Sequence, residues 1–426
     1  MRRLRLAFGS AVCLAATFAY ACGSGSHPSA IGDSDAAPPS DDGSRTIDGR
    51  IIDANPTASD APLGQLPTVD EPDVPCVQAG GTRVTLFSNA DSGGNGSPAI
   101  AHLQALRALR LGTGDNLPGF ATFDAIGQNA QVFDMSPGTV QTSFASEGDT
   151  IGAMIANAAT IEYQRFDAQG AALGGRVSLR TGLVPSPIAI WIAAGGGGSL
   201  GVWEAGKTLS AAGITAAGAS AGPAWQLSND GVAASVSIAY VGGKYAILWS
   251  VQPTSQSNLT RFVLADPSGI SGAPVEIASG GLQFSVIKLL PTPIGFLAVL
   301  LGAGGDNHVY TVPLDASGNV SGTAHRLLGA DYPWDIALQG NEVGLVTSGN
   351  DILVDGSEGP RKPLFRPLDL TGHPIGPWVC LDGFVPTGQY QDMALLQEAN
   401  GYALVYKTPA DDTVLVKFDH LGTGAP

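Results

Sequence analysis

The chain has 426 residues, of which 37 are Asp or Glu and 21 are Lys or Arg, and its formal net charge is −16 at pH 7. A surface this acidic repels the phosphate backbone of nucleic acids, so we expect no nucleic-acid partner. The 58 glycines and the scarcity of segments with a helical period argue against a mainly helical fold.

The first residues have the layout of a secretory signal. Arg2, Arg3 and Arg5 give the start of the chain a positive charge, and residues 6–21 carry no charge. A basic segment followed by a short apolar stretch is typical of a signal peptide, and its length is at the low edge for a membrane-spanning helix. We therefore predict that residues 1–21 are a signal peptide.

The apolar stretch ends in Ala19-Tyr20-Ala21-Cys22. Small residues before a cysteine resemble the lipobox of bacterial lipoproteins, although that family most often has Leu where Ala19 stands. The resemblance implies that Cys22 is lipidated and becomes the new N-terminus, so that lipid anchors the protein to a membrane. Gly23 after the cysteine implies sorting to the outer membrane. The alternative is ordinary cleavage after Ala21, which would give a soluble secreted protein.

Residues 22–75 are expected to form a flexible tether behind the lipid. After Cys22 they are rich in Gly, Ser, Asp, Ala and Pro, lack aromatic residues, and carry ten acidic residues against Arg45 and Arg50. Such a composition cannot bury enough apolar surface to offset the entropy cost of ordering, and its like charges repel one another. The folded domain is therefore predicted to cover residues 76–426.

Two of the four cysteines remain for a disulfide. Cys13 leaves with the signal peptide and Cys22 is expected to be acylated, so Cys76 and Cys380 are left. A pair in an exported chain is more often bonded than free. A metal or redox pair is the less favoured alternative, because the chain has no Cys-x-x-Cys motif.

A short motif, Asp-x-x-Gly after an apolar run, recurs through the chain. Successive copies are separated by 43, 99, 49, 54 and 50 residues, and the interval of 99 fits two units with a degenerate copy near residues 213–222. Seven units of about 50 residues result. The copies begin at Asp124, Asp167, Asp266, Asp315, Asp369 and Asp419.

The motif has the composition of a turn between antiparallel strands. Asp in the first position accepts hydrogen bonds from the backbone of the turn, and Gly in the fourth adopts the left-handed conformation. We therefore predict that these aspartates are structural rather than catalytic. A calcium loop would need further oxygen ligands at alternate positions, which these turns lack.

Each unit contains four short strand patterns. In the unit of Asp315 they cover residues 284–290, 296–301, 308–314 and 324–328. Four strands in about 50 residues are typical of one blade of a propeller, so the predicted fold is an all-β propeller of about seven four-stranded blades. A string of β-sandwich domains, with two repeats in each, is the alternative.

The two ends of the repeat region fit a ring. Residues 82–87 form an orphan strand before the repeats, and the last unit ends one strand short. We expect this N-terminal strand to complete the last blade and close the ring, which removes an open sheet edge. Residues 101–110 favour a helix by local propensity, but we expect the repeat to impose strands there.

The repeat region resembles lipid-anchored bacterial β-propellers, with Asp-x-x-Gly as its only recurrent motif. Trp334-Asp335 stands alone, so the Trp-Asp signature of better-marked propellers does not recur. These proteins are diverse in function, and the resemblance therefore implies a fold and no particular activity.

No catalytic signature is present. The chain lacks Gly-x-Ser-x-Gly, His-Glu-x-x-His and a phosphate-binding loop. The histidines of the repeat region are expected to be separate surface or strand residues, so we predict no metal and no cofactor; they are His102, His308, His325, His373 and His420. Trp203 and Trp249 stand at equivalent positions and are expected to pack between blades rather than stack on a sugar.

Polar loops of variable length connect the second and third strands of several units, on the face opposite the Asp-x-x-Gly turns. Such loops on a rigid scaffold commonly carry binding function. The residues predicted for a binding face are Asn258, Asp306, Asn307, Asp351, Asp355 and Asp411. We therefore predict a binding or scaffold module for a protein or glycan partner. The alternative is an enzyme, a hydrolase or lyase acting on a glycan, whose site is assembled around the propeller axis.

Overall fold

The computed structural model describes residues 66, 68–71, 76–78, 82–87, 100–103, 106–111, 119–129, 131–134, 141–183, 187–254, 257–278, 283–303, 308–328, 332–352, 358–381, 393–407 and 413–419. Every regular element in these ranges is a β-strand, which confirms the all-β fold. No helix long and apolar enough to cross a membrane occurs in this part of the chain. The predicted signal peptide and Cys22 lie outside it.

The described strands form seven sheets, which we number in chain order. Sheet 1 contains β4 (Ile100–Leu103), β5 (Leu106–Leu111), β6 (Gly119–Asp124) and β7 (Gln131–Asp134). Sheet 2 contains β8 (Gln141–Glu147), β9 (Thr150–Ala156), β10 (Ile161–Asp167) and β11 (Ala172–Arg180). Sheet 3 contains β12 (Pro187–Gly195), β13 (Gly198–Ala205), β14 (Thr208–Ile214) and β15 (Trp225–Ser228). Sheet 4 contains β16 (Val232–Val241), β17 (Lys244–Thr254), β18 (Ser257–Asp266), β19 (Gly269–Ile270) and β20 (Val275–Ala278).

The last three sheets each receive an additional strand from the start of the described chain. Sheet 5 contains β21 (Gln283–Thr292), β22 (Gly295–Ala303), β23 (Val309–Leu314) and β24 (Ala324–Leu327), with β1 (Thr68–Glu71) at its edge. Sheet 6 contains β25 (Tyr332–Gln339), β26 (Glu342–Ile352), β27 (Glu358–Asp369) and β28 (Val379–Cys380), with β2 (Val77–Gln78) at its edge. Sheet 7 contains β29 (Met393–Glu398), β30 (Gly401–Lys407), β31 (Thr413–Asp419) and β3 (Thr82–Phe87).

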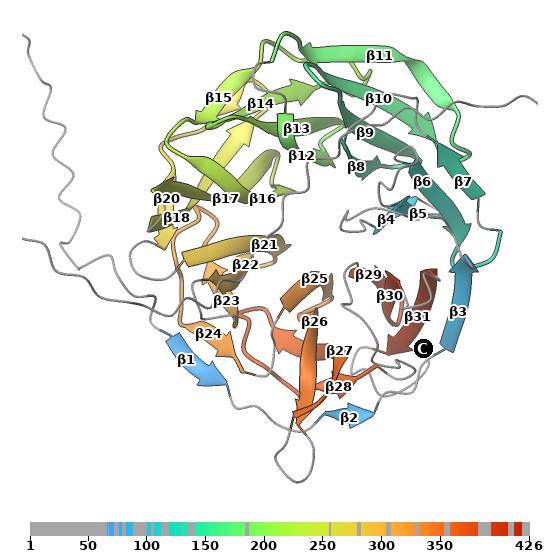
Figure 1. Cartoon of the computed structure of the whole chain (residues 1–426), viewed down its shortest axis with the longest axis vertical. Coiled ribbons are helices and arrows are strands. Elements are labelled where there is room, and N and C mark those ends of the chain that lie inside the picture. Colours follow the sequence, from blue (N-terminus) through green and yellow to red (C-terminus); the bar gives the residue numbers. More distant parts are fainter. Residues whose placement is uncertain are drawn as a thin grey trace, which may run out of the picture. The chain divides into compact units, whose positions relative to one another are not determined.

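The seven sheets lie around a common centre, with the first strand of each repeat innermost (Figure 1). Within each repeat, successive strands pair antiparallel, as in sheet 2, where β9 pairs with β8 and β10. This is the architecture of a β-propeller, as the repeat predicts. The segment over residues 101–110 is divided between the antiparallel strands β4 and β5, so the repeat overrides its helical propensity there.

The Asp-x-x-Gly motif forms the turn after the third strand of a repeat. In sheet 5, Oδ1 of Asp315 accepts hydrogen bonds from the backbone N–H groups of Ser317 at 2.8 Å and Asn319 at 2.9 Å. Asp124, Asp167 and Asp369 each accept two hydrogen bonds from backbone N–H groups of their turns in the same way. Asp266 accepts one such bond, from the backbone N–H of Ser268. Asp419 ends β31, and the turn predicted after it lies outside the described residues.

The degenerate copy expected near residues 213–222 is a turn with Thr215 in place of Asp. The backbone N–H of Gly218 donates to the carbonyl of Thr215 at 2.8 Å, and Oγ1 of Thr215 accepts from the N–H of Ala219 at 3.2 Å. A hydroxyl oxygen thus substitutes for the carboxylate, since either can accept from the turn backbone.

In five of the six described turns the glycine also lies close against the preceding sheet, and Gly269, with nothing within 4 Å of an added Cβ, is the exception. Gly318 has a φ of +88°, and a Cβ there would lie 1.9 Å from the ring of Phe262 in sheet 4. A Cβ at Gly372 would lie 2.5 Å from Thr311 in sheet 5, and one at Gly127 would lie 3.0 Å from Leu86 in sheet 7. The motif therefore serves the contact between neighbouring sheets as well as the turn.

Apolar side chains fill the space between neighbouring sheets. Trp203 packs with Met154 and Tyr163 of sheet 2, whereas Trp249 packs with Leu200 and Val202 of sheet 3. Both indole rings are fully buried, so the predicted packing of Trp203 and Trp249 between blades is confirmed. Burial of this apolar surface between sheets is the main source of stability in such a fold.

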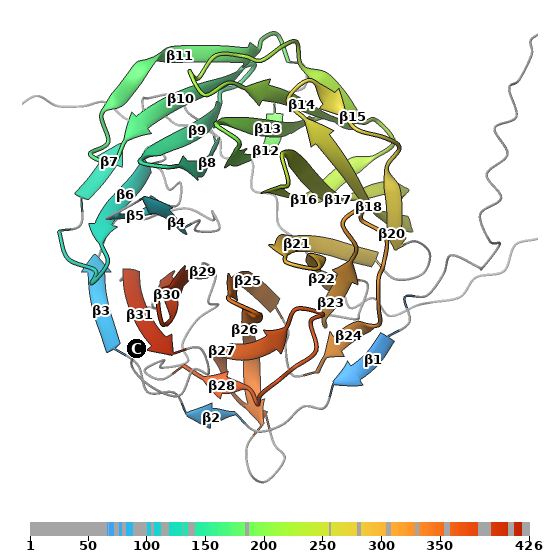
Figure 2. The same cartoon turned by 180° about the vertical axis from the view of Figure 1, so that it is seen from behind.

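The strands β1, β2 and β3 lie at the outer edges of sheets 5, 6 and 7 (Figure 2), and we call their residues, 68–71, 77–78 and 82–87, together with Cys76, the N-terminal strap. Its strand β1 pairs parallel with β24, β2 pairs parallel with β28, and β3 pairs antiparallel with β31. The prediction of a flexible tether up to residue 75 is therefore wrong for Thr68–Glu71. The outer edge of sheet 5 supplies the backbone partners of these residues, which composition alone does not reveal.

A disulfide joins the strap to sheet 6. The structure bonds the predicted pair, Cys76 and Cys380, with their Cα atoms 5.4 Å apart. This separation lies within the ordinary range for disulfides. The bond closes a loop across 304 positions of the sequence, for which the chain-entropy model gives a stabilisation on the order of 5 kcal/mol.

Replacing Gly318 by Ala tests the contact between turn and sheet. The left-handed φ and the overlap with Phe262 should together lower the free energy of unfolding by about 2–4 kcal/mol. Gly243 is a matched control, because it has a φ of +85° and nothing within 4 Å of an added Cβ, so Gly243→Ala should cost about 1–2 kcal/mol. Urea unfolding of both variants measures the difference. Equal losses would contradict a packing role for Gly318.

Candidate functional site

The residues predicted for the binding face lie largely outside what the structure describes. Asp306, Asn307, Asp355 and Asp411 fall in ranges that are not described. Asn258 lies near the start of β18 and Asp351 near the end of β26, and only their backbones are described. Both positions adjoin the connection between the second and third strands, at the opposite end of the sheet from the Asp-x-x-Gly turns.

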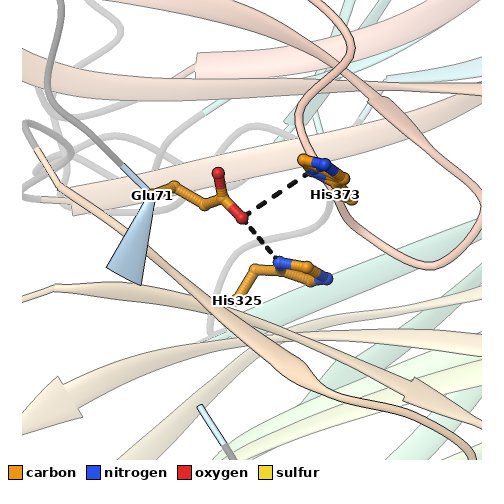
Figure 3. A group of neighbouring side chains, drawn as sticks. All are labelled: Glu71, His325 and His373. Atoms are coloured by element: carbon orange, nitrogen blue, oxygen red, sulfur yellow. Dashed lines mark hydrogen bonds and ion pairs between the residues drawn. The ribbon is translucent and has the colours of Figure 1, made fainter. Parts of the chain in front are cut away.

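A cluster of two histidines and one glutamate is the most distinctive polar feature of the described residues. Oε1 of Glu71 lies 2.7 Å from Nδ1 of His325 and 3.7 Å from Nδ1 of His373. The two imidazole rings stack with centroids 5.1 Å apart and an interplanar angle of 7°. Figure 3 shows the Glu71 carboxylate directed at both rings. We call Glu71, His325 and His373 the rim cluster.

Three separate elements position the rim cluster. Glu71 ends β1 of the strap, where it is paired in register with Leu327, and His325 lies two residues earlier on β24. His373 belongs to sheet 6 and follows the turn of Asp369, whose Oδ1 accepts the His373 backbone N–H at 3.0 Å. Burial raises the pKa of Asp369, but hydrogen bonds from Thr371 and the His373 N–H, with the nearby His373 charge, hold it below its usual value.

The three side chains of the rim cluster differ in their exposure to solvent. The side chains of Glu71 and His325 are 9% and 12% exposed, whereas that of His373 is 53% exposed. A carboxylate so far removed from water needs a proton donor or a cation beside it. Imidazole nitrogen and carboxylate oxygen are also ligands for divalent transition metals, and all three ligand atoms lie within 4.8 Å of one another.

Sequence reasoning missed the rim cluster. It predicts that His325 and His373 are separate surface or strand residues, but the structure brings them together at the boundary between sheets 5 and 6. The repeat pattern alone indicated part of this arrangement. It places His325 in the fourth strand of one repeat and His373 just after the Asp-x-x-Gly turn of the following repeat. Glu71 could not be found in this way, because it lies in the segment predicted as a tether.

Charged side chains on the first strands of sheets 5, 6 and 7 form contacts between sheets. Asp335 on β25 forms an ion pair with Lys288 on β21 and accepts the backbone N–H of Leu395 on β29 at 2.9 Å. Arg107 of sheet 1 binds Glu398 of sheet 7 through two hydrogen bonds, of 3.0 Å and 2.8 Å. These groups connect sheets 5, 6, 7 and 1, so their charges are used in assembling the propeller.

Asp335→Ala should destabilise the protein by about 2–4 kcal/mol. The change removes the acceptor of the Leu395 and Ile336 backbone N–H groups and leaves Lys288 without this partner. Asp149, which is exposed in the turn between β8 and β9, provides the control, because Asp149→Ala should change stability by less than about 0.5 kcal/mol. Thermal and urea unfolding measure both effects, and equal midpoints would refute the structural role of Asp335.

No protein-family model matches the chain, and no curated protein matches it. Solved structures with a similar fold include the β-propeller domain of the Trilobed protease from Pyrococcus furiosus, at 8% identity and a TM-score of 0.45, covering 75% of this chain and 95% of that one. The Dos1 propeller matches at 12% identity and a TM-score of 0.45, covering 74% and 78%.

A puromycin-hydrolyzing peptidase of Mycobacterium tuberculosis matches at 13% identity and a TM-score of 0.47, covering 83% of this chain and 56% of that one. The present chain thus spans little more than half the length of that peptidase. Identities this low concern the fold alone.

Proposed function

We propose that the chain is an exported lipoprotein, anchored through Cys22, whose propeller acts as a binding or scaffold module of the cell envelope. The observation that carries this proposal is the Cys76–Cys380 disulfide. Disulfides persist in oxidising compartments and are rare in the cytosol, so the bond supports export independently of the N-terminal signal. The outer membrane, implied by Gly23, is the proposed location.

We further propose that the seven sheets are the seven blades of a closed ring. Phe123 of sheet 1 packs with Leu396 and Leu415 of sheet 7, and Arg107 binds Glu398 across the same boundary. The pairing of β3 with β31 supplies the fourth strand of sheet 7. A ring held in this way is a rigid scaffold on which variable loops can present a binding surface.

A binding role is favoured over an enzyme with a site around the axis, because charged side chains near the centre form contacts between sheets. Asp335, Lys288, Arg107 and Glu398 are committed to contacts between sheets. Within the described ranges, the group of His, Asp, Glu or Cys residues close enough to share a metal ion lies on β1, on β24 and just after the turn of Asp369, away from the innermost strands. The proposed partner is a protein or a glycan, bound at the loops that carry Asp306, Asp351, Asp355 and Asp411.

Intact mass of the protein purified from bacterial membranes tests the anchor. We expect a mass that begins at Cys22 and includes acyl chains, and a gain of two hydrogens on reduction of the disulfide. Cys22→Ala should move the protein to the soluble fraction without altering the gain on reduction. A mass that begins at Cys22 without lipid would make the protein a soluble secreted one and would refute the proposed anchoring.

The binding face is tested by cross-linking in intact cells, followed by identification of the captured proteins and glycans. Alanine at Asp306, Asp351, Asp355 and Asp411 together should reduce capture of the specific partner at least about tenfold, since polar loop residues fix orientation in such interfaces. Asp149→Ala, on the opposite face, should leave capture unchanged. Undiminished capture by the fourfold variant would rule out this face.

A further inference from the structure

We propose that Glu71, His325 and His373 bind one divalent transition-metal ion of the zinc class. The bound ion would fasten the N-terminal strap to the boundary between sheets 5 and 6. This inference goes beyond the proposed binding function and does not depend on it, because it concerns the outer edge of the propeller rather than its loops.

The separations of the ligand atoms suit a small ion. In a tetrahedral zinc site with bonds of about 2.0–2.1 Å, two ligand atoms lie roughly 3.3–3.4 Å apart. Oε1 of Glu71 is 2.7 Å from one Nδ1 and 3.7 Å from the other, values that bracket this distance. All three ligand atoms lie within 4.8 Å of one another, so a single ion is within reach of each side chain. Because a metal lies close to the plane of each imidazole that binds it, the two parallel rings would also have to rotate when the ion binds.

The donor set selects the class of metal. Two imidazole nitrogens and one carboxylate oxygen favour zinc and its neighbours, whereas calcium and magnesium prefer sites made of oxygen alone. Three protein ligands leave a position for water, and the exposure of His373 gives solvent access to the site. An ion would also compensate the charge of the nearly buried Glu71 carboxylate.

The ligands are held by backbone contacts that do not require the metal. The turn of Asp369 fixes the main chain of His373, and antiparallel pairing with β23 fixes that of His325. Glu71 depends on the four-residue parallel pairing of β1 with β24. The main chains of two ligands are thus fixed on the propeller, and the third ligand arrives with the strap, so binding of the ion should stabilise docking of β1.

A simple ion pair is the competing explanation of the rim cluster. It accounts for the 2.7 Å contact of Glu71 with His325, and the 3.7 Å contact with the half-exposed His373 is then a weak ion pair screened by solvent. Under that explanation His373 is dispensable and added zinc binds no more tightly than to other surface histidines. Metal binding that requires His373 distinguishes the two.

The test is calorimetric titration of Zn²⁺ into the full chain, purified with its disulfide intact, without a histidine tag and after treatment with a chelator. We expect one ion per chain, and binding at least about tenfold weaker in His373→Ala, His325→Ala and Glu71→Gln, because loss of a ligand should cost at least as much as loss of a supporting residue. His308→Ala and Glu276→Gln are the matched controls and should bind as the wild type does. Failure of the wild type to bind saturably, or equal affinity in all variants, would overturn the proposal.

Hydrogen exchange provides a second readout that does not rely on affinity. Zn²⁺ should slow exchange of the backbone amides of Thr68–Glu71 in the wild type and leave it unchanged in His373→Ala. His373 is half exposed, so this variant should fold normally. Zinc binding with no change in the exchange of β1 would overturn the fastening role. Lipidation affects neither measurement, so these results are separable from the proposed anchor.

Discussion

The close contact between the turn of one sheet and the third strand or outer edge of the sheet before it governs this propeller. At Gly318 the turn backbone lies against the ring of Phe262, with no room for a side chain, and Gly127 approaches Leu86 of sheet 7 in a similar way. Since only glycine combines a left-handed φ with such an approach, the same residue shapes the hairpin and fixes the spacing of the sheets. The repeated motif is thus a constraint on assembly as well as a turn.

This double role explains how much of the fold the sequence could predict. The Asp-x-x-Gly copies revealed the length of the repeat. In the degenerate copy Thr215 replaces Asp, because its hydroxyl oxygen can also accept a hydrogen bond from the turn backbone. The orphan strand over residues 82–87 became β3, beside β31. The short strands β1 and β2 escaped prediction, because a parallel edge strand of two to four residues has no period and takes its hydrogen bonds from a distant part of the chain.

The rim cluster was harder to predict than the fold for a related reason. Glu71 lies 254 positions before His325 in sequence, and it reaches the histidines because β1 pairs with the edge of sheet 5. Local patterns report what a residue does to its own turn or strand. They do not report which sheet edge the strap pairs with. This tertiary contact brings the two histidines and the glutamate together.

Force applied along the chain from the N-terminus would be transmitted to the propeller through the strap. With the proposed lipid anchor, force along the chain would meet Leu66, which packs on the core between sheets 4 and 5, and then β1, where four residues and the contact of Glu71 with His325 resist it. The next fastening is covalent, at Cys76, so detachment of β1 would stop there and leave sheets 6 and 7 intact. A metal ion at the rim cluster would set the force at which the first fastening gives way.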